Sequence, residues 1–119
     1  MPCVLIVEDD PDIREFMQVL LTASGYETMT AANGEQALNL MRARKPCMVL
    51  LDLMMPVMDG FGFRERQLEE PTLALVPVLC LTAMFDAAYV AERLSVPCLN
   101  KPVPIDRLLS EVQERCASH

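Results

Sequence analysis

Short, solid apolar runs alternate with longer stretches of helical apolar spacing along the whole chain. The runs are too short for helices and rich in branched residues, so they indicate buried strands. The longer stretches repeat apolar residues at intervals of three and four, which is typical of amphipathic helices. This alternation predicts βα units, which build a parallel sheet with helices on both faces.

The expected elements have recognisable start and stop signals. Asp10 and Pro11 open the first helix, as a capping carboxylate followed by a residue that needs no N–H there, and Gly25 ends it. Asn33 and Gln36 form a capping box for the second helix. We expect strands at residues 3–7, 27–31, 47–51, 76–81 and 98–100, and helices at about 11–25, 34–45, 60–70, 86–94 and 104–116.

Two helices carry apolar stripes that we expect to face the sheet. Each stripe follows the spacing of one helical face. The stripe of the first helix is Ile13, Phe16, Met17, Leu20 and Leu21, and that of the last is Ile105, Leu108, Leu109 and Val112.

The predicted fold is a three-layer α/β/α sandwich around a five-stranded parallel sheet, because parallel strands are joined by right-handed helical crossovers. The chain has 119 residues, which suits one domain, so we expect residues 1–119 to form a single unit. No apolar stretch approaches the roughly 18 residues of a membrane span, and no signal peptide begins the sequence. The expected compartment is therefore the cytoplasm, without membrane attachment.

Charge and cysteine content restrict the partners. A net charge of −7 with only ten Lys and Arg argues against nucleic-acid binding, which needs clustered cations. The five cysteines are odd in number and show no C-x-x-C pair, so we interpret them as buried reduced thiols and not as a metal or redox site. The one histidine, His119, is the last residue, which leaves no internal histidine phosphodonor.

Chemically active side chains follow four of the predicted strands. Glu8 and Asp9 come after the first strand and Asp52 after the third. Thr82 ends the fourth, and Lys101 follows the fifth. Because open parallel sheets bind ligands at the carboxyl ends of their strands, we expect these side chains to converge.

Three carboxylates in one place repel one another unless a cation or a proton compensates. Carboxylate oxygens suit Mg²⁺, which retains part of its water and binds one or two carboxylates together with phosphate. An ionised aspartate can also accept a phosphoryl group as an acyl phosphate. The site therefore suits Mg²⁺-dependent phosphoryl transfer, with a lysine to balance the incoming charge.

Four segments resemble the signatures of the response-regulator receiver family, in order and across the whole chain. The most specific is the D-x-x-M-P-x-M-D-G pattern that begins at Asp52. The resemblance implies a flavodoxin-like fold with strand order 2-1-3-4-5. The segments are Val7–Asp10, Leu51–Gly60, Leu81–Ala83 and Asn100–Pro102.

The resemblance also implies roles for the acidic residues. Asp52 corresponds to the phosphoryl acceptor and, with Asp9, to a direct Mg²⁺ ligand. Glu8 corresponds to a further acidic partner that acts through water, and the main-chain carbonyl of Met54 to the third protein ligand. Mn²⁺ would be an acceptable substitute for Mg²⁺.

The remaining signature residues would report phosphorylation. Thr82 corresponds to the switch hydroxyl and Lys101 to the lysine that pairs with the acceptor or its phosphate. Pro102 corresponds to a proline whose preceding peptide bond is usually cis. The family further implies a sensor histidine kinase or phosphotransfer protein as donor, and a downstream protein or linked output domain as target.

Three departures from the family pattern concern output and lifetime. Cys98 stands where most members carry a switch Tyr or Phe. The interval from Thr82 to Lys101 is shorter than usual, so the fourth helix or the loop after it must be trimmed. Met54 stands where a polar side chain helps to orient water in some members, and methionine cannot supply that hydrogen bond.

Three other functions compete with phosphate acceptance. A receiver-like interaction module would bind a partner without phosphorylation, but it would not need the intact acids, threonine and lysine. A phosphatase of the haloacid dehalogenase type needs an aspartate where Met54 stands. A flavin carrier needs a hydroxyl-rich phosphate loop after the first strand, and Glu8 and Asp9 would repel that phosphate.

Overall fold

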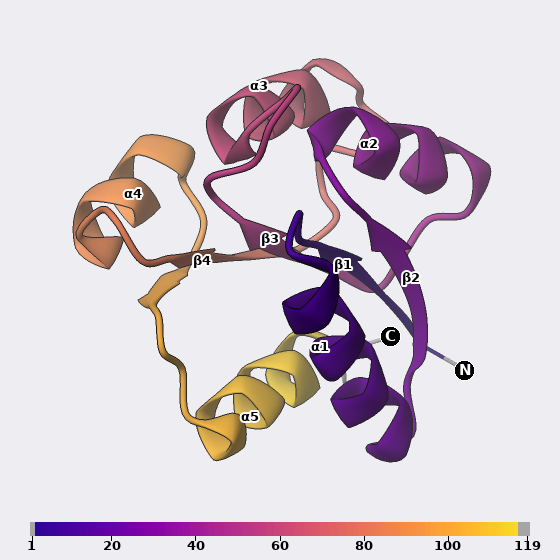
Figure 1. Ribbon diagram of the computed structural model, residues 1–119. Helices are drawn as coiled ribbons and strands as arrows, with labels where there is room; N and C mark the ends of the chain where they lie inside the picture. The colour runs from indigo at the N-terminus through magenta and orange to yellow at the C-terminus, as the bar shows by residue number, and fades with distance from the viewer. Residues whose placement is uncertain (1, 117–119) are drawn as a thin grey trace.

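The computed structural model describes residues 2–116, and in this part of the chain five strands alternate with five helices (Figure 1). The alternation predicted from the apolar pattern is therefore confirmed. The strands are β1 Cys3–Val7, β2 Glu27–Ala31, β3 Met48–Asp52, β4 Val78–Thr82 and β5 Cys98–Asn100. The helices are α1 Pro11–Ala23, α2 Gly34–Ala43, α3 Gly60–Glu69, α4 Ala87–Leu94 and α5 Ile105–Cys116.

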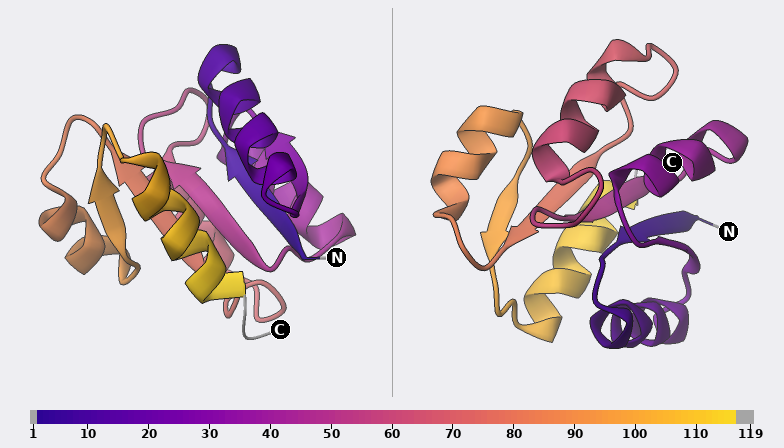
Figure 2. Two further views of the ribbon diagram at one scale, coloured as in Figure 1. Left: turned by 90° about the horizontal axis from the view of Figure 1, so that it is seen from below. Right: turned by 45° about the horizontal axis from the view of Figure 1, so that its top comes forward.

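All neighbouring strands of the sheet are parallel, in the order β2-β1-β3-β4-β5. This confirms the expected strand order and the three-layer architecture. Helices α1 and α5 lie side by side on one face, while α2, α3 and α4 cover the other (Figures 1 and 2). The carboxyl ends of β1, β3 and β4 therefore meet at one edge, where the chain turns away into loops.

The core has two layers, one on each face of the sheet. Strands β1, β3 and β4 are buried along their whole length, because helices cover both of their faces. Leu5 and Leu51 point toward α2 and α3, whereas Ile6 and Leu50 point toward α1 and α5. Solid apolar runs are thus required here, and the period-two alternation of a half-exposed strand is absent from these three.

The predicted caps are present at the first two helices. The Asp10 side chain accepts hydrogen bonds from the backbone N–H groups of Asp12 and Ile13. Asn33 accepts from the N–H of Gln36, whose side chain in turn accepts from the N–H of Ala32. These bonds satisfy N–H groups that have no partner inside a helix and so determine where each helix begins.

The expected apolar stripes are only partly buried. Met17 and Leu21 of α1 are buried, but Ile13 and Phe16 are 40% and 55% exposed. Ile105 at the start of α5 is also exposed, while Leu108 and Val112 are buried. The prediction was wrong for these exposed residues because each helix contacts the sheet along a line narrower than its apolar stripe.

The cysteines differ from the sequence prediction. Cys47 and Cys116 form a disulfide with their Cα atoms 5.4 Å apart, although 69 positions separate them in sequence. The remaining three are free, Cys3 and Cys80 buried and Cys98 half-buried. The chain folds the end of α5 back against the start of β3, and spacing in the sequence gives no signal of that pairing.

Two further expectations concern the last residue of the chain and membrane-spanning helices. His119 lies outside the described residues. Among the helices that the structure describes, none combines the length and the apolar character needed to cross a membrane.

Candidate functional site

Polar side chains follow the strands at one edge of the sheet. Glu8 and Asp9 directly follow β1, and Asp52 is the last residue of β3. Thr82 is the last residue of β4, and Lys101 directly follows β5. The parallel register places these strand ends next to one another, so that the sheet itself assembles the site.

Three carboxylates form the acidic part of this site. Glu8, Asp9 and Asp52 each offer one oxygen within 4.8 Å of the others. Glu8 is 3% exposed and Asp52 9% exposed, whereas Asp9 is open to solvent. Carboxylates held this close do not all remain ionised unless positive charge is supplied, so the cluster requires a cation or a proton. Hard oxygen donors of this kind are the ligands that Mg²⁺ prefers, and the residues therefore fit that ion.

Lys101 supplies positive charge from the loop that follows β5. Its Nζ lies 3.0 Å from Asp52 Oδ1 and 3.7 Å from Glu8 Oε2. Its backbone N–H donates to the carbonyl of Thr82 over 2.7 Å, which joins the end of β4 to the start of the loop between β5 and α5. The peptide bond between Lys101 and Pro102 is cis.

The charges within the site change the acid–base behaviour of two groups. Burial raises the pKa of Glu8 from 4.5 to about 8, and the hydrogen bond and negative charge of Asp52 add to this effect. For Lys101, burial acts to lower the pKa, but the hydrogen bond and charges of Asp52 and Glu8 outweigh it and raise the pKa. At neutral pH the metal-free site therefore holds one proton on Glu8 and an ammonium on Lys101.

Thr82 is fully buried beside this cluster. Its Oγ1 accepts a hydrogen bond from the N–H of Phe85 at 3.2 Å, so that the hydroxyl also organises the loop between β4 and α4. Met54 lies two residues after Asp52 in the loop that follows β3, and its side chain is 41% exposed.

The loop from Asp52 to α3 is held in a tight shape. The N–H of Gly60 donates to the carbonyl of Leu53 over 2.7 Å, and a Cβ added at Gly60 would lie 3.0 Å from Leu53 Cα. Asp59 caps α3 through the N–H of Gly62. A side chain at Gly60 would push the loop away. Asp59 and Gly60 at the end of the loop therefore fix the backbone that follows β3.

The contacts of two supporting residues were not predicted from the sequence. The Arg14 guanidinium donates to the main-chain carbonyl of Glu8 at 2.9 Å. The Asn100 side chain donates to the carbonyl of Phe85 and accepts from the N–H of Ala87, which ties the end of β5 to the start of α4. Arg14 lies on the helix that follows the acidic pair, and Asn100 belongs to the Asn100–Pro102 segment, so position in or next to the motifs was the available signal.

Cys98, which the family resemblance sets in the position of a switch aromatic, lies on the last strand of the sheet. It begins β5, pairs in register with Cys80 of β4, and packs against the core beneath α4. Burial raises the pKa of the Cys98 thiol. The helix before it, α4, has eight residues and is the shortest helix in the part of the chain that the structure describes.

Comparison with known proteins assigns the family. Residues 4–113 match the response regulator receiver domain family. The chain belongs to this family and is a receiver domain of two-component signalling.

Similar proteins of known sequence are regulators of transcription by their names. One is a probable transcriptional regulator ycf27 of Porphyra purpurea, 42% identical over 68% of this chain and 32% of the relative. Another is the DNA-binding dual master transcriptional regulator RpaA of Synechocystis, 32% identical over 95% of this chain and 48% of the relative. The chain thus spans about a third to a half of the length of the curated relatives it matches.

Solved structures show the same fold. The receiver domain of a signal transduction histidine kinase from Syntrophus aciditrophicus aligns with a TM-score of 0.90 at 28% identity, over 99% of this chain and 92% of that one. The chemotaxis response regulator CheY4 of Vibrio cholerae aligns with a TM-score of 0.86 at 30% identity, over 97% and 98%.

Proposed function

We propose that this receiver domain accepts a phosphoryl group on Asp52 from a histidine kinase or a histidine-containing phosphotransfer protein. One observation carries this proposal: the buried Asp52 carboxylate lies 3.0 Å from the Lys101 ammonium and beside two further acids at the carboxyl edge of the sheet. The site is thus arranged to hold one reactive carboxylate among balanced charges. We further propose that residues 1–119 form a single signalling domain without catalytic turnover of its own, in the cytoplasm.

Asp9, Asp52 and the Met54 carbonyl would hold Mg²⁺ directly, and Glu8 would reach it through water. Mn²⁺ would serve in its place. When bound, the ion neutralises negative charge on the incoming phosphoryl group. The residue types support this, because carboxylate and carbonyl oxygens with room for water are the donor set of Mg²⁺.

In this proposal the protein residues divide the remaining work. A carboxylate oxygen of Asp52 attacks phosphorus as the bond to the donor nitrogen breaks, and the acyl phosphate forms. Lys101 is already within hydrogen-bond distance of Asp52 and would pair with a phosphoryl oxygen after transfer. The Thr82 hydroxyl would exchange its loop contact for a bond to the phosphate, which changes the loop before α4.

The names of the relatives support a further proposal about output. Several are regulators of transcription that are two to three times longer than the matched region. We propose that the signal passes from this domain to a downstream protein or to a covalently linked output domain, and that nucleic acid is not bound by the domain itself, whose net charge is −7.

A small-molecule phosphodonor tests the proposal directly. Incubation with acetyl phosphate and Mg²⁺ should add one phosphate to the intact chain, detected by mass spectrometry, in a linkage that hydroxylamine cleaves. Asp52→Asn should abolish the addition, whereas the control Asp12→Asn, at an exposed position on α1, should leave it unchanged. Equal phosphate incorporation by Asp52→Asn would refute the assignment of the acceptor.

A non-covalent mimic separates this function from that of a simple interaction module. Beryllofluoride with Mg²⁺ should raise the melting temperature of the wild-type chain and leave that of Asp52→Asn unaffected. Absence of any effect on the wild type would favour the interaction module.

A further inference from the structure

The Cys47–Cys116 disulfide lies at the opposite edge of the sheet from Asp52. Cys47 directly precedes β3, and Cys116 is the last residue of α5. The bond therefore connects two elements whose other ends approach the phosphorylation site, since β3 ends at Asp52 and α5 begins shortly after Lys101.

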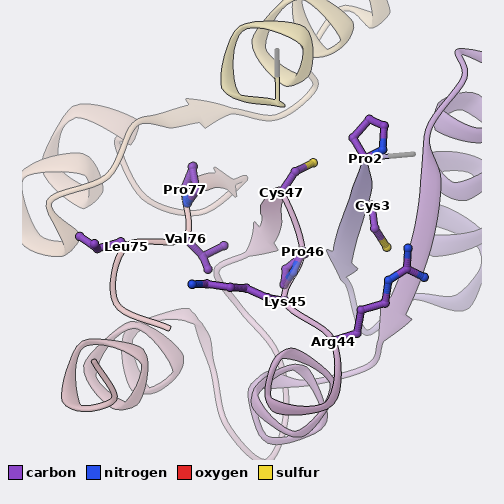
Figure 3. A pocket seen from close by; sticks show the side chains of 9 residues that line it. All are labelled: Pro2, Cys3, Arg44, Lys45, Pro46, Cys47, Leu75, Val76 and Pro77. Atoms are coloured by element: carbon purple, nitrogen blue, oxygen red, sulfur yellow. The ribbon is translucent and has the colours of Figure 1, made fainter. Parts of the chain in front are cut away.

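A cavity of about 440 Å³ is present at this edge and is lined in part by Cys47 (Figure 3). Residues around the starts of β1, β3 and β4 form its walls, among them Arg44, Lys45 and Val76. Leu75 on its rim is 89% exposed, so the cavity is accessible from solvent. Figure 3 shows Lys45 extending along the cavity toward Val76 and the Cys47 side chain pointing away from Arg44.

The two cysteine residues of the disulfide are unequally exposed. Cys47 is half-buried and lines the cavity, whereas Cys116 is only 4% exposed. Of the two cysteines, Cys47 is therefore the one next to which a small thiol in the cavity would lie. Arg44 pairs with Glu27, but Lys45 is in none of the ion pairs formed by the described residues, so its charge is available to an anion in the cavity. A positive charge in the cavity raises the local concentration of an anionic thiol, and its thiolate form is the attacking species in thiol–disulfide exchange.

We propose that Cys47–Cys116 is a reversible redox site, opened by an anionic low-molecular-weight thiol that enters this cavity and attacks Cys47. This inference rests on the proposed cytoplasmic location, because disulfides there are usually transient and redox-sensing. It does not depend on which residue accepts phosphate.

The exchange proceeds in two steps. The incoming thiolate bonds to Cys47 Sγ as the bond to Cys116 Sγ breaks, and the Cys116 sulfur leaves with the electron pair and takes up a proton. A second thiolate then attacks the sulfur of the bound reagent, and Cys47 is released as a thiol. Two reagent thiols are thereby oxidised to one disulfide, and the protein gains two electrons and two protons.

Opening the bond releases the last turn of α5. The buried residues of this helix are Leu108, Val112 and Cys116, so the disulfide is the final attachment of its C-terminal end to the sheet. Arg115 pairs with Glu111 of the same helix and gives no tie to the sheet. The redox state would thus determine how firmly the end of α5 is held.

Alkylation and mass spectrometry of the full chain in glutathione buffers test the proposal. The folded chain is treated with glutathione, quenched with acid and then alkylated in denaturant, so that the buried thiols also react. The untreated chain should be labelled at Cys3, Cys80 and Cys98, and millimolar glutathione should raise the number of labelled cysteines from three to five. Hydrogen exchange in the last turn of α5 should become faster on reduction, with β1 and β4 unchanged. A bond that survives millimolar glutathione in the folded chain, or exchange in α5 that does not change, would overturn the proposal.

Two variants test the route of attack. In Cys116→Ser, the free Cys47 thiolate should attack oxidised glutathione and keep one half as a mixed disulfide while the other half leaves as a thiol. A short pulse of reduced glutathione on the wild type should give the same mixed disulfide on Cys47, because the Cys47–Cys116 bond is then the one that breaks. Lys45→Glu should slow opening by glutathione roughly threefold but not opening by neutral mercaptoethanol, because it removes only the attraction for the anionic reagent. The control Arg66→Glu, an exposed residue of α3 outside the cavity, should change neither rate. Trapping at Cys98 in place of Cys47, or equal slowing with both reagents, would contradict the proposed entry through the cavity.

Discussion

Replacement of Glu8 by glutamine should stabilise the metal-free domain, against the usual effect of changing a buried site residue. The pKa of Glu8 is raised from 4.5 in the unfolded chain to about 8 in the folded one. An acid with a raised folded pKa contributes its full stability below pH 4.5 and loses it as the pH rises toward 8. The loss relative to low pH amounts to about 1 kcal/mol at pH 5 and about 3 kcal/mol at pH 7.

Glu8→Gln has no proton to lose, so its free energy of unfolding should exceed that of the wild type by about these amounts. Urea unfolding in the presence of a chelator, followed by circular dichroism at pH 5, 7 and 8, measures the difference. Glu15→Gln, at an exposed position of α1, is the control and should give a curve parallel to that of the wild type. A difference between Glu8→Gln and wild type that stays constant with pH would refute the reasoning. Added Mg²⁺ should stabilise the wild type more than Glu8→Gln, because an ionised carboxylate attracts the ion.

Three further outcomes follow from the same contacts. Lys101→Met should lower the free energy of unfolding in chelator by about 2 kcal/mol, measured by urea titration, because Asp52 loses its charge partner; an unchanged midpoint would contradict the ion pair. Since Met54 cannot orient water, the acyl phosphate should last minutes or longer, and Met54→Asn should shorten its lifetime roughly tenfold in a phosphate-release assay; a half-life of seconds in the wild type would sink this prediction. Reduction of Cys47–Cys116 should lower the free energy of unfolding by about 4 kcal/mol, as expected for a bond that closes a loop of this length, and a Cys47→Ser, Cys116→Ser double variant should match the reduced wild type.

The elements of the fold could be predicted from sequence because their signals are local. Buried parallel strands read as solid apolar runs, and the caps at Asp10 and Asn33 mark helix starts through bonds that span only two or three residues. Boundaries moved slightly where the pattern was ambiguous: β3 begins at Met48 and β4 at Val78, each a little later than predicted.

The site was predictable for a different reason. In a parallel sheet all carboxyl ends lie at one edge, so the residue after each strand is a candidate without any knowledge of tertiary contacts. The electrostatics of the site could be predicted from the sequence only in part. That Glu8 is the acid with the strongly raised pKa depends on its burial and on its contact with Asp52, which the sequence does not specify.

Long-range pairings could not be predicted. The Cys47–Cys116 bond depends on the path by which α5 returns across the sheet, and a count of cysteines carries no information on that path. The burial of Phe16 was wrongly predicted for a related reason. The width of the contact between α1 and the sheet depends on packing, and helical periodicity does not determine it.

The size of Cys98 limits the way in which this domain can transmit a signal. A cysteine has one heavy atom beyond Cβ and a single side-chain torsion that moves it, so its rotation sweeps a small volume and cannot expose or withdraw a large apolar surface. The main-chain hydrogen bond from Lys101 to Thr82 and the Asn100 bridge to Phe85 and Ala87 connect the same region through the backbone. A displacement of the β4–α4 loop would therefore move whole backbone segments, namely the end of β5 and the start of α4, and would not depend on the rotation of one side chain.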